Sequence, residues 1–115
     1  LERCAASGVE RVFINTHHLA EKIRAFCGDG SRWNLRITYS YEPELLGTAG
    51  ALNAFRDDLA TAPFAVIYGD NLLEFDLDAL REAHTRQRAD ATVAIHFRED
   101  VSTSGMVVTA PDGRI

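Results

Sequence analysis

The sequence predicts an α/β domain with a largely parallel sheet, and three observations support this fold class. Short apolar runs alternate with amphipathic helical segments along the whole chain, which is the pattern of strand–helix–strand units. Residues 64–68 (FAVIY) are apolar throughout, as in a parallel strand that helices cover on both faces. Residues 16–27 and 78–88 place apolar side chains at helical spacing, so each predicts a helix packed on the sheet.

The first half of the chain predicts two strands joined by a helix. Residues 1–7 resemble the last turns of a helix, and Gly8 suits its end because glycine adopts positive φ at little cost. Residues 11–15 form an apolar run typical of a buried strand. After the helix over residues 16–27, apolar and polar side chains alternate over residues 35–41, as in a half-buried strand.

The second half predicts a further series of strands and helices. A loop runs into a short helix, for which Thr48 is the expected N-cap. Pro111, Asp112 and Gly113 are typical of a turn between two strands. The expected elements are, in order, a strand over residues 64–68, a helix over 78–88, a strand over 91–97, and a hairpin over 106–115.

The composition is that of an ordinary globular protein, and it argues against several functional classes. Of 115 residues, 46% are hydrophobic and 25% are charged, which disfavours disorder and fibrous structure. The net charge is −5 and the basic residues are scattered, so no basic stripe favours nucleic-acid binding. No apolar run is long enough for a membrane span or a secretory signal, and we therefore expect a cytoplasmic location. Cys4 and Cys27 are too few for a disulfide framework or a cysteine zinc site, and buried or half-buried thiols are expected.

Polar residues follow the expected strands, where ligands bind in open parallel sheets. The sharpest of these is Asp70, which a buried strand delivers to the edge of the sheet directly after Gly69. A carboxylate there suits Mg²⁺, which takes one or two carboxylates together with phosphate oxygens and waters. The alternative is that Asp70 caps a turn with Asn71, as such residues often do. The polar stretches are residues 15–18, 42–50 and 69–76.

The second stretch offers glycines and a carboxylate. Gly47 and Gly50 flank Thr48 at a helix start, where small residues leave backbone N–H groups open to a phosphate or a base edge. Close packing of helix on strand explains these glycines equally well. Glu42 is a candidate acceptor for the nitrogens of a base, and an exposed carboxylate at the rim is the alternative.

The other candidate ligands have simpler interpretations. His17 and His18 are adjacent at an expected helix start and point in different directions, which argues against a metal pair. Glu74, Asp76 and Asp78 are typical of a helix-capping cluster, with Asp76 as a weak second metal candidate because it lies near Asp70 in sequence.

Two linked runs resemble the sugar nucleotidylyltransferase family. YEPELLGTAGAL at residues 41–52, followed by VIYGDNL at residues 66–72, is similar to its nucleotide-binding and metal-binding segments. Residues 14–23 resemble the family's second strand and helix, and residues 104–108 with 112–115 resemble its sugar-side strand and hairpin. The family includes mannose-1-phosphate guanylyltransferases and glucose-1-phosphate thymidylyl- and uridylyltransferases.

The resemblance implies a specific fold. It is a Rossmann-like, three-layer (GT-A-like) nucleotidyltransferase domain with a mixed, mainly parallel sheet, of which residues 1–115 are a partial domain. The first central strand, expected between residues 11–15 and 64–68, belongs upstream of Leu1 together with the family's Gly-rich phosphate loop, its catalytic Arg and the following Lys. The second metal-binding Asp belongs downstream. We therefore expect residues 1–115 alone neither to fold stably nor to catalyse, because unpaired strand edges and apolar faces are left exposed.

The resemblance also implies an activity and roles for named residues. A nucleotidyl group passes from an NTP to a sugar 1-phosphate, giving an NDP-sugar and pyrophosphate, with Mg²⁺ held by Asp70. Gly47 and Thr48 lie against the base and ribose, Glu42 lies at the base edge, and Gly105 approaches the sugar hydroxyls through its backbone. No other catalytic residue is expected within the segment. The expected partners are the NTP and the sugar 1-phosphate, and a second copy of the chain, in a homo-oligomer, is a further candidate.

Two other functions are weighed against this one. A non-catalytic regulatory or assembly subunit with the same fold would retain the sheet and lose the chemistry. A dinucleotide-binding domain is disfavoured, because no Gly-x-Gly-x-x-Gly follows a strand here. Within the family, the LGTAG run is more like the guanylyl and uridylyl branches than the thymidylyl branch.

Overall fold

The structure is a computed structural model that describes residues 1–71, 76–97, 99, 100, 102 and 105–115. The chain separates into two compact units, Leu1–Asp78 and Ala79–Ile115. Leu72, Glu74 and Ser104, which the sequence interpretation used, lie outside the described residues, as does the side chain of Thr48. The elements are α1 (Glu2–Ala6), β1 (Arg11–Thr16), α2 (Ala20–Cys27), η1 (Ser31–Trp33), β2 (Arg36–Tyr41), α3 (Gly47–Gly50), η2 (Ala51–Phe55), α4 (Arg56–Leu59) and α5 (Leu77–Gln87).

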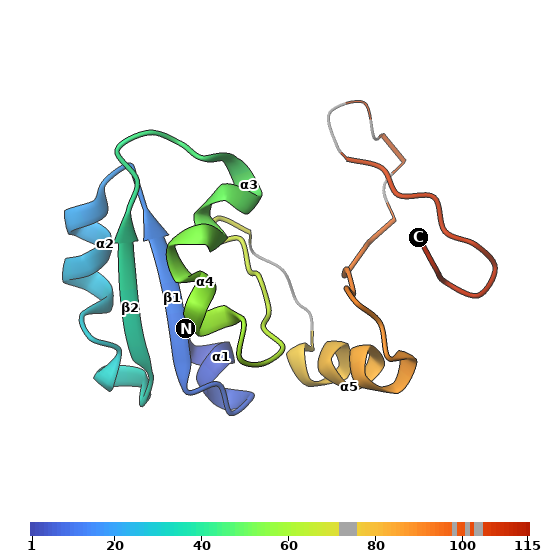
Figure 1. Cartoon of the computed structure of the whole chain (residues 1–115), viewed down its shortest axis with the longest axis horizontal. Coiled ribbons are helices and arrows are strands. Elements are labelled where there is room, and N and C mark those ends of the chain that lie inside the picture. The colour runs from blue at the N-terminus through green and yellow to red at the C-terminus, as the bar shows by residue number, and fades with distance from the viewer. Residues whose placement is uncertain (72–75, 98, 101, 103–104) are drawn as a thin grey trace. The chain divides into compact units, whose positions relative to one another are not determined.

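A parallel pair of strands forms the centre of the first unit (Figure 1). The register runs from Arg11 opposite Arg36 to Thr16 opposite Tyr41. Parallel neighbours need a crossover connection, and α2 supplies it between the two strands. The predicted α/β class with parallel pairing is therefore confirmed for this unit, as are the two predicted strands.

One face of the sheet packs against the segment that follows α3. The Phe13 and Phe55 ring centroids lie 5.0 Å apart with the rings tilted by 48°. Phe55 is only 7% exposed and belongs to the small buried core with Leu35 and Ala51. This contact fixes η2 against β1 and so fixes the position of α3, which directly precedes η2.

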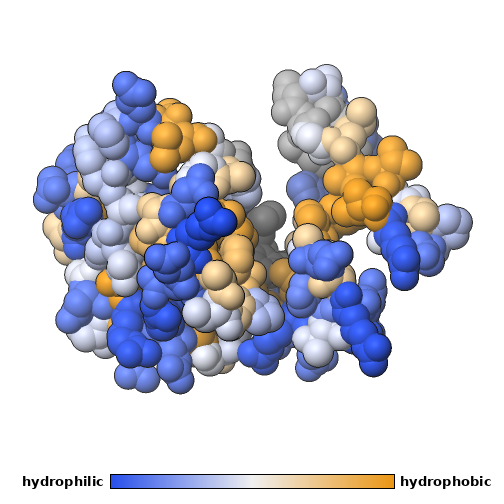
Figure 2. All heavy atoms as spheres, in the orientation of Figure 1, coloured by the Kyte–Doolittle hydropathy of each residue, from blue (hydrophilic) through white to orange (hydrophobic). Residues whose placement is uncertain are grey.

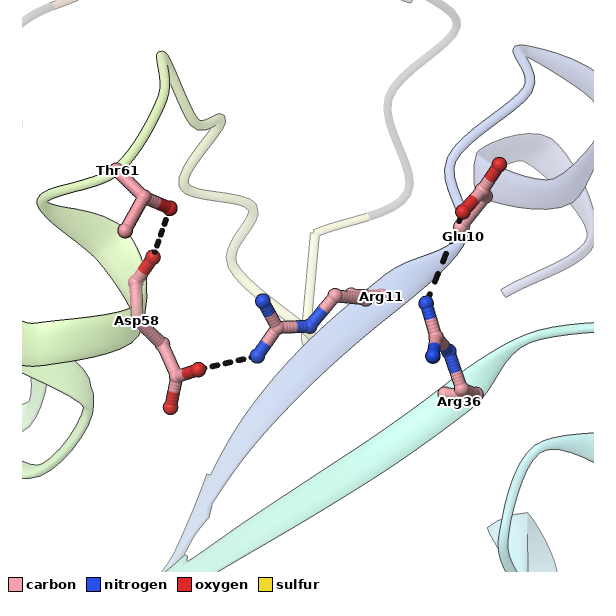
Figure 3. A network of polar contacts seen from close by, with 5 residues as sticks. All are labelled: Glu10, Arg11, Arg36, Asp58 and Thr61. Carbon is pink, nitrogen blue, oxygen red and sulfur yellow. Dashed lines mark hydrogen bonds and ion pairs between the residues drawn. The ribbon is translucent and has the colours of Figure 1, made fainter.

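Polar contacts at the amino ends of the strands reinforce this packing (Figure 3). Arg11 of β1 forms an ion pair with Asp58 of α4. Thr61 donates its hydroxyl to the carbonyl oxygen of Asp58 at 2.8 Å and so closes the end of α4. Arg36 of β2 lies 3.7 Å from the Glu10 carboxylate, where both side chains are largely exposed. The first ion pair joins α4 to β1 across the sheet face.

The opposite face packs against α2. Tyr39 is the register partner of Ile14, and successive strand residues point to opposite faces. The Arg24 guanidinium lies 4.9 Å from the centroid of the Tyr39 ring, and the tyrosine hydroxyl donates to the Gly28 carbonyl at 2.7 Å. Partial burial raises the pKa of Tyr39. Tyr39 therefore anchors both the last turn and the end of α2.

Both of the longer predicted helices are present, but their ends agree with the prediction to different degrees. The predicted helix over residues 78–88 is α5, shifted by one residue at each end. The helix predicted over residues 16–27 begins only at Ala20. Thr16 closes β1, and Leu19 has a left-handed φ of 53°, so the chain turns before α2 begins.

The strands predicted over residues 64–68, 91–97 and 106–109 are wrong for this structure, because β1 and β2 are the only strands among the described residues. An apolar run adopts a stable strand only beside a partner that takes up its backbone hydrogen bonds. These runs have no such partner within the described chain, and their apolar side chains are exposed. Figure 2 shows apolar side chains, in orange, at the surface of the segment that follows α5. The predicted turn does form, since Gly113 N–H donates to the Ala110 carbonyl at 2.9 Å.

Candidate functional site

The carboxyl ends of β1 and β2 meet at Glu42. β1 ends at Thr16 and β2 at Tyr41, and Glu42 N–H donates to the Thr16 carbonyl at 2.8 Å. This bond continues the ladder by one residue beyond β2. It holds the backbone of Glu42 beside the end of the neighbouring strand, at the sheet edge where ligands bind in parallel α/β folds.

The Glu42 carboxylate is buried and is held by N–H donors. Glu42 is 3% exposed, so the alternative of an exposed rim carboxylate is wrong. The Asn15 side-chain Nδ2 lies 3.2 Å from Oε1, and the Leu46 backbone N–H lies 3.4 Å from Oε2. No Arg or Lys pairs with Glu42 within the described part of the chain. Burial of a carboxylate without a cation is costly, so these donors are what stabilises it.

The residues that end β1 fasten the same corner. Thr16, 1% exposed, donates its hydroxyl to the Ser40 carbonyl at 2.8 Å. His17 Nδ1 lies 2.7 Å from the Glu42 carbonyl. A carbonyl oxygen only accepts, so His17 carries a proton on Nδ1. His17 precedes α2 rather than beginning it, and it acts here as a clamp on Glu42.

The glycine segment after Glu42 forms a short helix. α3 begins at Gly47 with Leu46 as its N-cap, so the prediction that Thr48 is the N-cap is wrong: Thr48 lies inside the helix. Gly47 has φ +74°, a conformation that residues with a Cβ rarely adopt. A Cβ at Gly50 would lie 2.6 Å from the Leu46 Cβ. The positive φ thus accounts for glycine at position 47, and the close contact with Leu46 accounts for glycine at position 50.

Asp70 lies in an exposed turn after residues 64–68. Asn71 N–H lies 3.3 Å from the Tyr68 carbonyl, which closes the turn through the backbone. The Asp70 carboxylate accepts no hydrogen bond from any described residue, so its oxygens are free to bind a hard cation such as Mg²⁺. Asp76 differs, because its Oδ1 accepts the Asp78 N–H at 2.9 Å at the start of α5. The capping interpretation of Asp76 is therefore confirmed.

The remaining candidate, Gly105, lies in the unit Ala79–Ile115, whereas the other candidates lie in Leu1–Asp78. A Cβ at Gly105 would meet nothing within 4 Å, so packing does not require glycine there. Among the described residues, no three His, Cys, Asp or Glu side chains gather as a metal cluster. No described helix has the length and apolar character needed to cross a membrane. The free thiols Cys4 and Cys27 are half-buried, as predicted.

The structure thus brings Glu42 together with the start of the Leu46–Gly50 segment, and no hydrogen bond among the described residues joins Asp70 to them. No role for Asn15 is predicted from the sequence, although it lies in one of the polar stretches that follow the strands. The signal in the sequence was its position at the end of a predicted strand; the structure adds the register, which places Asn15 opposite Ser40, two residues before Glu42 on the adjacent parallel strand.

Comparisons with known proteins find similarity along the whole chain. The model of the nucleotidyl transferase family matches residues 1–115. UTP–glucose-1-phosphate uridylyltransferase of Synechocystis sp. is 34% identical over 132 residues, which cover 100% of this chain and 33% of that protein. Mannose-1-phosphate guanylyltransferase of Mycobacterium tuberculosis is 34% identical over 115 residues, covering 100% and 32%. D-glycero-alpha-D-manno-heptose 1-phosphate guanylyltransferase of Aneurinibacillus thermoaerophilus is 31% identical over 108 residues, covering 94% and 46%. The chain spans about a third of the length of the first two relatives.

Proposed function

The chain belongs to the nucleotidyl transferase family, and from this premise we propose that the protein containing it transfers a nucleotidyl group from an NTP to a sugar 1-phosphate. The products are an NDP-sugar and pyrophosphate. The observation that carries the proposal is the family match over residues 1–115, which includes every candidate site residue. The relatives, named as uridylyl- and guanylyltransferases of sugar 1-phosphates, support the substrate class.

We further propose that residues 1–115 are part of one Rossmann-like, three-layer nucleotidyltransferase domain with a mixed, mainly parallel sheet. In this fold a further strand lies between β1 and residues 64–68. The exposure of the apolar side chains of Phe64, Ile67 and Tyr68 supports this arrangement, because a neighbouring strand and covering helices would bury them.

The reaction is an in-line displacement at phosphorus. An oxygen of the sugar phosphate attacks the α-phosphorus of the NTP and forms the new P–O bond. The bond from the α-phosphorus to the oxygen bridging the β-phosphate breaks, and pyrophosphate leaves with that oxygen. The protein contributes mainly by positioning the two substrates and by neutralising charge on the phosphates.

Asp70 is the proposed Mg²⁺ ligand. Its exposed carboxylate has no hydrogen-bond partner among the described residues, and Mg²⁺ takes carboxylate oxygens together with phosphate oxygens. Gly69 adds no side chain beside it, and a Cβ there would meet nothing within 4 Å, which leaves room for a triphosphate. When bound, Mg²⁺ supplies charge neutralisation to the phosphate oxygens.

Glu42, Gly47 and Thr48 form the proposed nucleoside side of the site, with Gly105 on the sugar side. Glu42 is a buried acceptor at the carboxyl end of the sheet, and Leu46 joins it directly to the glycine segment. Each carboxylate oxygen accepts more than one hydrogen bond, so Asn15 and Leu46 leave acceptor capacity on Glu42 for the N–H groups of a base that reaches this buried side chain. A carboxylate favours a base edge rich in N–H donors, such as that of guanine, over a base that presents mainly acceptors. Use of NTP as a substrate supports a cytoplasmic location.

The test measures pyrophosphate release by the full-length protein with Mg²⁺. The panel crosses GTP, UTP, dTTP, ATP and CTP with mannose 1-phosphate, glucose 1-phosphate and related sugar phosphates. We expect release from one preferred pair, a loss of two orders of magnitude or so in Asp70→Asn, and wild-type rates in Asp57→Asn, an exposed control on α4. A folded protein that releases no pyrophosphate from any pair would overturn the proposal in favour of a non-catalytic subunit.

A further inference from the structure

The Glu42 carboxylate joins two segments of the chain that are distant in sequence. Oε1 faces the amide nitrogen of Asn15 on β1 at 3.2 Å, and Oε2 faces the backbone N–H of Leu46 at 3.4 Å. Because ionised carboxylate oxygens only accept, both partners must donate. A single side chain thus links the end of β1 to the start of α3.

Asn15 is the partner that a rigid element holds. It is the penultimate residue of β1 and pairs in register with Ser40 of β2, so its backbone is fixed by the parallel ladder. Leu46, by contrast, is the N-cap that precedes α3 and lies outside any strand. β1 therefore holds Asn15 in place, Asn15 orients the Glu42 carboxylate, and the carboxylate in turn orients the Leu46 N–H.

The burial of Glu42 raises the cost of losing either of these N–H donors. The residue is 3% exposed, and no Arg or Lys pairs with it within the described residues. In such surroundings the loss of one N–H donor leaves a desolvated carboxylate under-satisfied. The clamp between His17 Nδ1 and the Glu42 carbonyl holds the backbone and does not involve the carboxylate. The amide of Asn15 and the Leu46 N–H are thus the groups that hydrogen-bond the carboxylate itself.

We infer that Asn15 is a positioning residue for nucleobase recognition. It orients the Glu42 carboxylate and, through Oε2, the Leu46–Gly47 backbone at the start of α3. This inference rests on the proposed function, in which Glu42 and Gly47 contact the nucleoside. It predicts that loss of the Asn15 amide raises KM for the NTP and weakens discrimination among bases, while KM for the sugar phosphate changes little.

The test is a polarity exchange in the full-length protein. Asn15→Asp removes the donor and places a second carboxylate beside Glu42, which repels it. We expect KM for the preferred NTP to rise roughly tenfold, and hydrogen exchange of the Leu46 amide, followed by NMR, to accelerate by a similar factor. Adding Glu42→Gln restores the link with donor and acceptor exchanged. The carboxylate now at position 15 accepts from the side-chain amide N–H at position 42, while the side-chain oxygen at position 42 still accepts the Leu46 N–H. The double variant is therefore expected to return Leu46 exchange to near the wild-type rate.

The matched control is Asn53→Asp, the same chemical change at an exposed position on η2. If Asn15→Asp matches this control in both KM for the NTP and Leu46 exchange, the inference is overturned. A lower melting temperature with KM for the NTP unchanged would also overturn it, because Asn15 would then be merely structural. Failure of the proposed function has a different signature: the wild-type protein releases no pyrophosphate, and the exchange measurement still reports whether Asn15 orients Glu42.

Discussion

Replacement of Phe55 by alanine should strongly destabilise the packing that positions α3. Phe55 is 7% exposed, its ring packs on Phe13 at a centroid distance of 5.0 Å, and its backbone lies at the end of η2. Truncation removes the ring and leaves a cavity between η2 and β1. The surrounding elements are short, so few other contacts compensate for the loss.

The magnitude follows from the burial of the ring. An aromatic side chain buries about 150–250 Å², which at about 25 cal/mol per Å² corresponds to at most about 4–6 kcal/mol. Phe13, the partner, is only half-buried, so part of the new cavity opens to water. We therefore expect Phe55→Ala to lower the free energy of unfolding by about 3 kcal/mol, at the low end of measured Phe→Ala changes.

The assay is urea unfolding of the full-length protein, with the free energy obtained by linear extrapolation. Phe55→Leu is the matched control, because it keeps most of the apolar volume and should cost less than about 1.5 kcal/mol. A loss below about 1 kcal/mol for Phe55→Ala, or equal losses for both variants, would refute the argument that this ring fixes η2 on β1.

Three further predictions concern the polar contacts. A double-mutant cycle on Arg11 and Asp58, whose side chains are each 46% exposed, should give a coupling energy of only about 0.2–1 kcal/mol that falls with added salt; a coupling above about 2 kcal/mol would contradict this. Ser40→Ala should leave stability unchanged or raise it by up to about 1 kcal/mol, since its buried hydroxyl has no hydrogen-bond partner among the described residues; clear destabilisation on urea unfolding would contradict this. Partial burial raises the pKa of Tyr39 above its ordinary value of 10.0, so its contribution to stability is full below pH 10.0 and is lost as pH rises through the folded-state pKa. Phenolate absorbance compared with Tyr39→Phe measures that pKa, and titration below pH 10.0 would be the contrary result.

The sequence predicted the elements whose partners are close in the chain. β1 and β2 were expected from apolar periodicity, and their pairing needs only the α2 crossover between them. α5 was likewise expected from its apolar spacing, and its cap at Asp76 was foreseen from the acidic cluster. Both signals come from residues that are close together in the sequence, so they do not depend on the other strands of the sheet.

The failures have two causes, one non-local and one local. Residues 64–68 are as apolar as a buried strand, but strand geometry needs a neighbour that takes up its backbone hydrogen bonds. α2 begins later than predicted, because Leu19 adopts a left-handed turn between the polar residues His17 and His18 and the helix. No propensity scale predicts such a turn for leucine.

The candidate site was predicted by residue type, and its geometry was not. Glu42 was singled out for its place after a strand, but periodicity does not indicate that its side chain is buried. Its carboxylate is hydrogen-bonded by Asn15 and Leu46, which reach it from another strand and from the following loop. The roles of Asp70 and Gly105 stay predictions that depend on substrate binding.

The most direct test of the proposed function is ³¹P NMR of the full-length protein with its preferred NTP, the sugar 1-phosphate and Mg²⁺. Nucleotidyl transfer predicts that the NTP and sugar-phosphate signals fall together, while NDP-sugar and pyrophosphate signals rise in equal amounts. Hydrolysis of the NTP to NDP and inorganic phosphate, or an unchanged spectrum from a folded protein, would contradict the assignment.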